Sequence, residues 1–436
     1  MKTKSLRLFL LLEASSLGLT ACGGSPAAEG SSMQAFVGAR IIDGTGGEPI
    51  ERGVIIVQDG AIQAVGAEGA VEIPDGATVI DVEGRTIIPG LINTHGHVGG
   101  ARGLETGQYS RENALDQLGL YARYGVTTVV SLGGDGPEGI QIREEQSDSA
   151  LNRSRLFVAG PVVAAQTPEE AVTQVQEVAA MGVDWVKFRV DDNLDTATKM
   201  PPEVYQAIIQ EAHRQGIPAA VHLVELEDAK ALVQAGVDIL AHSVRDVPVD
   251  EELVNLMRER RICLIPTLTR DLSTFVYGSR PAFFDDAFFL EEADPAVLEA
   301  LEDPARQSGI REDAAAQYWQ AQLPLAQQNM KTLLEGGAGI AMGTDTGQPG
   351  RFQGYFEHLE MEMMAEAGLT PMQVLVSATG EAARCMGLDV DLGTIEPGKR
   401  ADLVVLQANP LSDIRNTRTI ESVWINGNQV PERNAQ

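Results

Sequence analysis

Cysteine is scarce in this chain, with three in 436 residues. Small proteins that depend on disulfides are rich in cysteine, so a disulfide framework is not expected. Two of the three, Cys263 and Cys385, stand in the apolar stretches RRICLIPT and AARCMGL. Because unpaired cysteine is often buried and behaves as a small apolar side chain, we expect both to be buried free thiols.

Positive charge is also in short supply. The chain has 33 Lys and Arg against 62 Asp and Glu, which gives a net charge of −29. Such a surface repels nucleic acid and offers it no basic patch, so nucleic acid is not among the expected partners. The sequence has neither a repeat of solenoid period nor a long low-complexity tract. A hydrophobic fraction of 44% is ordinary for a globular protein with a sizeable core.

The N-terminus has the pattern of a processing segment. A basic start, MKTKSLR, runs into the apolar stretch LFLLL, which is too short to span a membrane as a mature helix. The following LTAC resembles the lipobox of bacterial lipoproteins, whose cysteine is lipidated and becomes the first mature residue. We therefore expect a signal peptide over 1–21, lipidation at Cys22, a flexible tether over 22–33, and an exported protein anchored in the bacterial cell envelope. A plain secretory signal and an unstructured N-terminus are the alternatives.

Short strands dominate both ends of the mature chain. Residues 34–88 contain three stretches in which apolar and polar residues alternate and then break at Gly or Asp-Gly. Short strands and an Asn-Gly turn return within 389–436. The two segments flank everything between them, so we expect them to join in one small β-sandwich domain.

Between these segments, over 89–388, short apolar runs alternate with amphipathic helical stretches that begin at Pro and acidic residues and end at Gly. Eight such units predict an α/β fold of the (β/α)8 TIM-barrel type. The eight runs cover 86–98, 125–134, 154–160, 182–190, 216–224, 236–244, 260–269 and 338–347. An aromatic-rich insert at about 270–320 precedes the last run. We expect a lid or a subunit contact there, the latter making a homo-oligomer.

Four of the six histidines fall at predicted strand ends, where the chemistry of such a barrel sits. His95 and His97 are two apart on the first strand, so their side chains point to the same face. His222 ends the fifth strand, His242 the sixth, and Asp345 the eighth. Imidazole and carboxylate are ligands for zinc and similar ions, so these residues predict a metal site.

Lys187 stands inside the apolar fourth strand, in a chain where lysine is rare. Burial lowers the pKa of a lysine. The neutral amine can react with carbon dioxide to form a carbamate, an anionic ligand able to bridge two metals.

Each of these residues also has an ordinary role open to it. His222 or His242 alone could be a core histidine with satisfied hydrogen bonds, and Asp345 could cap the next helix. Lys187 could simply pair with an acid such as Asp191.

Taken together, PGLINTHGHV, the single histidines of strands five and six, the Asp of GTDTG and the ending GTIEPGKRADLVVLQANPL resemble the amidohydrolase superfamily. The resemblance is strongest to its imidazolonepropionase-like and Xaa-Pro dipeptidase branch. It implies a metal-dependent hydrolase that cleaves a C–N bond in an amide, a peptide or a cyclic amide. It also implies two divalent ions, foremost zinc. His95 and His97 would bind one, His222 and His242 the other, carboxylated Lys187 would bridge them, and Asp345 would bind metal and take the proton of the attacking water.

Two departures bear on the substrate, which the resemblance implies is a small molecule. The stretch FRVDD after the fourth-strand run lacks the glycines usual in the dipeptidases, and Asn93 stands where many relatives carry Asp. Residues near strand ends that could bind a substrate carboxylate are Arg189, Arg270, Tyr277, Arg351 and Tyr355. Two alternatives remain: a one-metal imidazolonepropionase-like or deaminase-type hydrolase with unmodified Lys187, and a non-catalytic surface lipoprotein.

Overall fold

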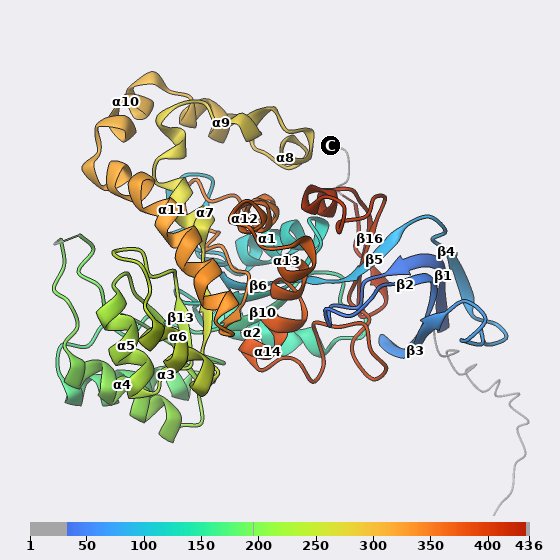
Figure 1. Cartoon of the computed structure of the whole chain (residues 1–436), viewed down its shortest axis with the longest axis horizontal. Helices are drawn as coiled ribbons and strands as arrows, with labels where there is room; N and C mark the ends of the chain where they lie inside the picture. The colour runs from blue at the N-terminus through green and yellow to red at the C-terminus, as the bar shows by residue number, and fades with distance from the viewer. Residues whose placement is uncertain (1–32, 195, 433–436) are drawn as a thin grey trace, which may run out of the picture.

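A computed structural model of the chain describes residues 33–194 and 196–432. A mixed β-sheet lies at one end of the molecule, and an α/β body with a helical insert forms the rest (Figure 1). None of the described helices combines the length and the hydropathy needed to cross a bilayer. The expected signal peptide, Cys22 and all but the last residue of the expected tether lie outside the described residues and stay predictions.

The terminal segments join in one sheet, as expected. Its order is β18-β17-β16-β5-β1-β2-β3, with β4 beside β1, so C-terminal β16 pairs antiparallel with N-terminal β5. The strands are β1 (Met33–Ile41), β2 (Ile50–Gln58), β3 (Ala61–Ala67), β4 (Thr78–Asp81), β5 (Thr86–Pro89), β16 (Leu403–Leu406), β17 (Ile420–Ile425) and β18 (Asn428–Gln429). All eight belong to one hydrogen-bonded sheet, so the second sheet of a sandwich is not confirmed for the described residues.

Two hairpins of this sheet follow from turn chemistry. Asp59 and Gly60, between β2 and β3, have φ of 51° and 79°, and Asn426 and Gly427, between β17 and β18, have φ of 53° and 70°. Two consecutive positive φ angles are what a type I′ turn requires, and Asp-Gly and Asn-Gly adopt it readily. These dipeptides therefore set the strand boundaries.

Eight parallel strands form the α/β body. They are β6 (Leu91–Gly96), β9 (Val126–Ser131), β10 (Arg155–Val158), β11 (Val186–Arg189), β12 (Ala219–His222), β13 (Ile239–Ala241), β14 (Cys263–Ile265) and β15 (Gly339–Ile340). They form two sheets, β10-β9-β6 and β11-β12-β13-β14-β15, linked by the single bridges Gly96↔Thr346 and Val163↔Phe188. The arrangement is consistent with a TIM barrel, but the described strands do not form one closed ladder. Backbone hydrogen bonds from Thr94 N to Met342 O at 3.0 Å and from His97 N to Thr346 O at 2.8 Å join β6 to the segment after β15.

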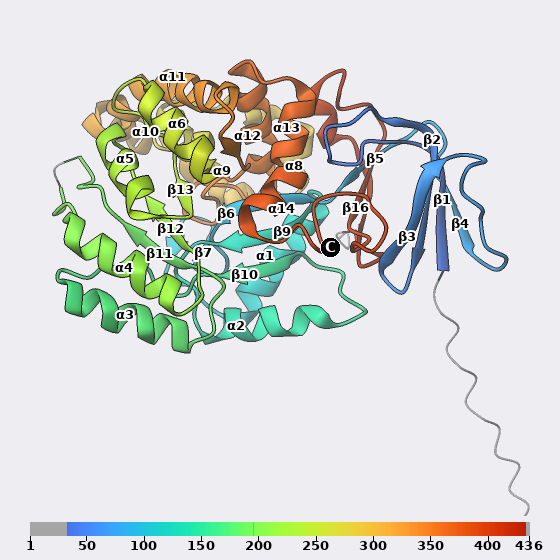
Figure 2. The same cartoon turned by 60° about the horizontal axis from the view of Figure 1, so that its bottom comes forward.

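Helices follow most strands and cover their outer side, as Figure 2 shows for α3 to α6. Their starts carry the expected caps: Thr167 accepts from the N–H of Glu170 before α3, and Asp250 from that of Leu253 before α6. The helices are α1 (Arg111–Arg123), α2 (Pro137–Glu144), α3 (Pro168–Ala180), α4 (Pro202–Arg214), α5 (Leu226–Ala235), α6 (Glu251–Arg260), α12 (Tyr355–Glu366), α13 (Pro371–Ser377) and α14 (Gly380–Met386). A short hairpin, β7 (Ala101–Arg102) and β8 (Glu105–Thr106), follows β6.

The insert is helical and has a small core of its own. It runs through α7 (Leu268–Ser273), α8 (Ala287–Leu290), α9 (Pro295–Leu301) and α10 (Pro304–Glu312) into the long α11 (Ala314–Glu335). Tyr277, Phe284 and Phe289 are buried against Tyr355 and Phe356 of α12. The aromatic cluster thus packs the insert against the barrel, and both a lid and a contact with another subunit stay predictions.

The two cysteines form a disulfide, so the prediction of free thiols is wrong. The Cys263–Cys385 bond links β14 to α14, with the two Cα atoms 6.0 Å apart. Both cysteines lie at the same apolar cluster, as their sequence surroundings indicated. A disulfide forms only where the fold brings the two Cβ atoms close together. These cysteines are 122 residues apart in the chain, so their proximity could not be inferred from local sequence.

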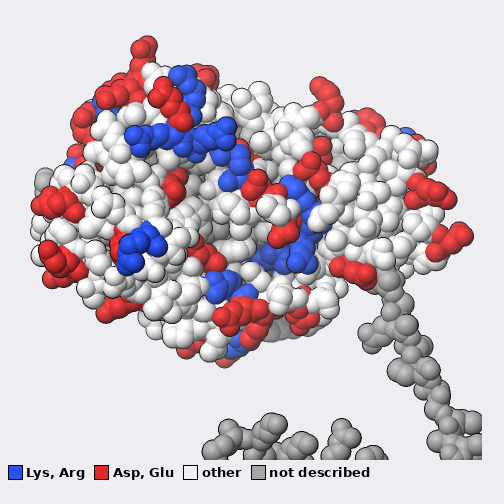
Figure 3. All heavy atoms as spheres, turned by 90° about the horizontal axis from the view of Figure 1, so that it is seen from below, with Lys and Arg blue, Asp and Glu red and all other residues white. Residues whose placement is uncertain are grey.

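On the face drawn in Figure 3, basic side chains gather in separate groups, and acidic side chains lie between and around them. On this face the described residues therefore present a surface of mixed charge.

Candidate metal centre

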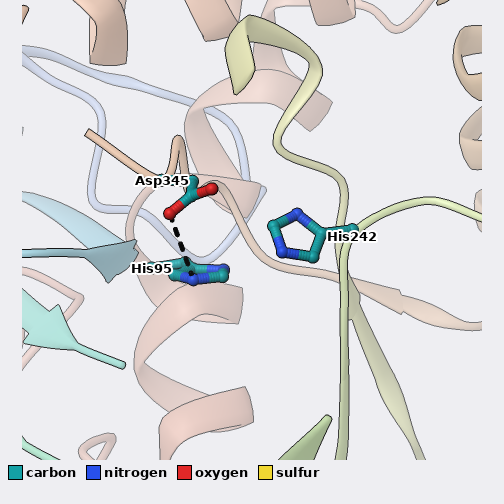
Figure 4. A group of neighbouring side chains, drawn as sticks. All are labelled: His95, His242 and Asp345. Atoms are coloured by element: carbon teal, nitrogen blue, oxygen red, sulfur yellow. Dashed lines mark ion pairs between the residues drawn. The ribbon is translucent and has the colours of Figure 1, made fainter. Parts of the chain in front are cut away.

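The four histidines predicted as ligands converge in the structure. The ring centroids of His95 and His97 are 5.6 Å apart, those of His95 and His242 4.9 Å, and those of His222 and His242 4.1 Å. His95 and His242 are each 1% exposed. Ligand atoms of His95, His242 and Asp345 all lie within 4.8 Å of one another, and Figure 4 shows the three side chains facing a common space.

Asp345 reaches this space from the loop after β15. Its Oδ1 lies 2.7 Å from His97 Nε2 and 3.6 Å from His95 Nε2. Burial alone would raise the pKa of Asp345, but Arg351 and the two imidazoles hold it well below its usual value. The alternative role as a helix cap is not seen, because the next helix, α12, has Gly354 at its N-cap. Asp345 is therefore a buried carboxylate placed among imidazoles.

Lys187 points into the same space from β11. Its Nζ lies 3.5 Å from His95 Nε2, and the residue is 4% exposed. Burial lowers the pKa of Lys187 to about 7. The acid considered as its alternative partner, Asp191, instead accepts from Arg189 Nε at 2.6 Å and lies 3.3 Å from His222 Nε2. Lys187 is thus a buried amine beside the histidines.

The donor set of the centre fits a divalent metal. His95 Nδ1 is buried and has no hydrogen-bond partner, although buried polar atoms almost always have one, and the buried His222 Nε2 has Asp191 Oδ1 near it, at 3.3 Å. His97 Nδ1 lies 2.8 Å from Gly133 O, and His242 Nδ1 2.6 Å from Thr267 Oγ1. Such bonds orient metal-binding imidazoles and leave the opposite ring nitrogen free to bind.

The protonation of three of the four imidazoles agrees with this fit. Burial lowers the pKa of His222 to about 3 and that of His95 and His242 well below the usual value. Neutral imidazole is the form that binds metal.

A cavity of about 440 Å³ opens above these residues. All six predicted ligands line it, together with three arginines, Arg189, Arg270 and Arg351, and with Leu132, Val162, Gln348 and Pro349. Three of the predicted substrate residues therefore face the cavity.

Tyr277 and Tyr355, also predicted to bind substrate, do not line this cavity. The Tyr277 hydroxyl donates to Gly350 O at 2.5 Å, and that of Tyr355 donates to Asp286 at 2.9 Å. Both rings belong to the aromatic core under the insert. Tyr277 can act on the cavity through the loop that carries Gly350 and Arg351.

Two arginines near the cavity share one aromatic ring. The guanidinium carbons of Arg245 and Arg270 lie 4.6 Å and 4.7 Å from the ring centre of Trp319, which α11 supplies. Both arginines pair with the single carboxylate of Asp271, at 3.0 Å and 2.8 Å. Arg270 Nε is buried and has no hydrogen-bond partner. This corner therefore carries an excess positive charge.

Sequence reasoning missed several residues of the site. Arg245 and Trp319 lie far apart in the chain, and no local pattern relates them. Glu357, on α12, is fully buried beneath the centre, and burial raises its pKa to about 7. Its sequence signal is weak, because it is one of four acids in the helix YFEHLEMEMMAE and a solvent-facing acid would look the same.

Known proteins resemble this chain over most of its length. The family model described as the amidohydrolase family matches residues 86–430. Ochratoxinase of Aspergillus niger is 26% identical over 287 residues, covering 63% of this chain and about half, 52%, of that protein. A 5-methylthioadenosine/S-adenosylhomocysteine deaminase of Symbiobacterium thermophilum is 25% identical over 398 residues, covering 82% and 81%.

Solved structures share the fold. A Xaa-Pro dipeptidase with bound methionine superposes with a TM-score of 0.75 at 23% identity, over 92% of this chain and 100% of that one. The Aspergillus niger ochratoxinase structure gives a TM-score of 0.71 at 20% identity, over 92% and 95%. The family predicted from the motifs is confirmed: this chain belongs to the amidohydrolase family.

Proposed function

We propose that the protein is a metal-dependent hydrolase that cleaves a C–N bond in an amide, a peptide or a cyclic amide. One observation carries the proposal: four imidazoles, one buried lysine and one carboxylate, from six different positions along the chain, line a single cavity. Membership of the amidohydrolase family supports it, as does the likeness to a Xaa-Pro dipeptidase and an ochratoxinase.

The ligand set divides into two parts. His95 and His97 would hold one divalent ion, His222 and His242 the other, and Lys187, as a carbamate, would bridge them. Zinc suits these nitrogen and oxygen donors. When bound, such ions polarise a carbonyl and bring the pKa of a coordinated water to about 7.

Asp345 would move the proton. It takes a proton from the attacking water at a carboxylate oxygen and returns it to the leaving nitrogen, so the C–N bond breaks to an acid and an amine. Arg351 Nη1 donates to Asp345 Oδ2 at 2.5 Å and leaves Oδ1 facing the imidazoles. The arginine thereby fixes the orientation of the base.

The arginines of the cavity favour a substrate that bears a carboxylate. Arg189 is engaged with Asp191 and Arg351 with Asp345, whereas Arg270 has its Nε–H free of protein partners. Arg270 and Arg245 share one carboxylate, so an anionic group of the substrate would balance the remaining charge. We therefore assign Arg270 the principal contact with the substrate carboxylate.

Replacement of this contact has a predictable effect. Arg270→Leu is expected to raise KM for carboxylate substrates by about 10–100-fold, because a hydrogen bond to a charged group contributes about 1.5–3 kcal/mol. The zinc-loaded enzyme would first be screened against dipeptides, N-acyl amino acids and small lactams, and KM then compared between the best substrate and its carboxamide analogue. Arg280→Leu, which removes an arginine of the insert paired with Asp285 and Glu302, is the control. An equal loss on both substrates would count against the assignment.

Two alternatives predict other results. A one-metal hydrolase or deaminase with unmodified Lys187 would bind one ion per chain. A non-catalytic lipoprotein would need no ligand set, yet every predicted ligand lines the cavity.

We further propose that the protein is exported and held at a bacterial membrane by lipid on Cys22. The Cys263–Cys385 disulfide supports export, because such bonds persist in oxidising compartments. Cys22→Ala is expected to abolish labelling by a fatty-acid probe and to move the protein from the membrane to the soluble fraction. An acylated, membrane-bound variant would rule out this anchor.

A further inference from the structure

A buried carboxylate on α12 lies directly behind the metal centre. Glu357 is 0% exposed, and its Oε1 accepts three hydrogen bonds. The donors are Asn93 Nδ2 at 2.6 Å, Thr344 Oγ1 at 2.7 Å and Thr346 Oγ1 at 2.7 Å. Asn93 comes from β6 and the threonines from the loop after β15, so one oxygen atom ties the first strand of the barrel to the last.

Each donor is attached to a segment that carries metal ligands. Asn93 Oδ1 accepts from the backbone N–H of His95 at 3.0 Å. Thr344 and Thr346 flank Asp345, which has a left-handed backbone with φ of 59°. A non-glycine residue keeps such a conformation where its surroundings fix it. The bonds to Glu357 hold both neighbours of Asp345 and the amide that orients His95.

One arrangement of the hydrogens in this cluster gives Glu357 all three of its bonds, with the two threonine hydroxyl oxygens 2.8 Å apart. In this arrangement both threonine hydroxyls donate to Glu357, and Tyr121 donates its hydroxyl hydrogen to Thr346 Oγ1, at 2.7 Å. The second amide hydrogen of Asn93 reaches Thr344 Oγ1 at 3.0 Å. The arrangement needs a donor at position 93. An ionised aspartate there would provide none and would place a second negative charge 2.6 Å from Glu357 in a buried site, where such a charge is costly.

We propose that Glu357 is a positioning residue that sets His95 and Asp345 for metal binding, and that Asn93 is its required partner. The inference rests on the proposed function for the role of these ligands, but it concerns metal affinity and can be tested without a substrate.

The experiment is a double-mutant cycle on zinc affinity. Wild type, Asn93→Asp, Glu357→Gln and the double variant are stripped of metal and titrated with zinc against a chromogenic chelator. Substitution of a residue that orients a metal ligand typically lowers metal affinity by about 10–100-fold. We therefore expect Asn93→Asp to weaken zinc binding by about 100-fold. Glu357→Gln keeps the accepting oxygen and should change it only a few-fold. The double variant regains a donor–acceptor pair and should recover to within about 10-fold of wild type.

A matched control separates positioning from general stability. Asp402 is a second buried carboxylate, bonded to Arg155 and to the N–H of Asn426 where the terminal sheet meets the barrel. Asp402→Asn is expected to lower Tm and leave zinc affinity unchanged. The proposal is overturned if Asn93→Asp weakens zinc binding no more than Asp402→Asn does, or if the two changes in the cycle are simply additive.

Other outcomes are equally decisive. If Asn93→Asp does not fold, Thr346→Val removes one donor to Glu357, and zinc affinity at wild-type level in that variant would overturn the proposal. A wild type that binds no zinc overturns both this inference and the proposed function. A wild type that binds zinc but hydrolyses no C–N bond overturns the function alone, and the cycle still decides the role of Glu357.

Discussion

Replacement of Lys187 by alanine is expected to reduce bound metal to one ion or none per chain and turnover to near zero. The side chain is buried, lies 3.5 Å from His95 Nε2, and has a pKa lowered to about 7 by burial. A carbamate at this position would be the anion between two cations. Without it the two cations would repel each other in a site of low dielectric constant, where such repulsion is strong. Metal analysis and kcat on the best substrate check this result.

Two comparisons make the Lys187 test specific. Short carboxylates, such as acetate, or bicarbonate should partly restore metal and activity in Lys187→Ala, because they can occupy the place of the bridge. Lys199→Ala removes a half-buried lysine that pairs with Glu225 and Asp228, and it should leave metal content unchanged. If Lys187 served only to pair with an acid, its loss would lower the stability of the fold and leave metal content unchanged.

Removal of the disulfide is expected to cost about 2–5 kcal/mol of unfolding free energy. The bond joins residues 122 apart and ties β14 of the barrel to α14, so it restricts a long loop of the unfolded chain. The double variant Cys263→Ala/Cys385→Ala should therefore unfold at lower urea concentration than wild type. A reductant should destabilise wild type and leave the variant unchanged. Equal midpoints for wild type with and without reductant would show that the bond does not stabilise the fold.

Local patterns predicted the elements of the fold well. Asp59-Gly60 and Asn426-Gly427 form turns because the two positive φ angles of a type I′ turn depend only on the residues of the turn itself. Each of the eight apolar runs contains one of the eight parallel strands, because a short run of apolar residues by itself indicates a buried strand. What could not be predicted depends on tertiary contacts. The pairing of Cys263 with Cys385 and the number of hydrogen-bonded sheets are set by segments distant in sequence.

The same distinction holds within the site. His95, His97, His222, His242 and Asp345 could be placed because strand ends meet at one edge of a barrel. The partners that orient them could not be. Thr267, which bonds His242, and Glu357, behind Asp345, lie in a loop and a helix whose packing the sequence pattern does not encode. Tyr277 follows a strand in sequence, but the fold of the insert turns its ring into an aromatic core.

The most direct test of the account is elemental analysis of the purified wild-type protein and of Lys187→Ala, each loaded with zinc and freed of excess metal. The account predicts two zinc ions per chain in wild type, one or none in the variant, and loss of C–N hydrolysis when wild type is stripped by a chelator. Two zinc ions retained in Lys187→Ala would contradict the carbamate bridge. Full hydrolytic activity in metal-free wild type would contradict the metal centre itself.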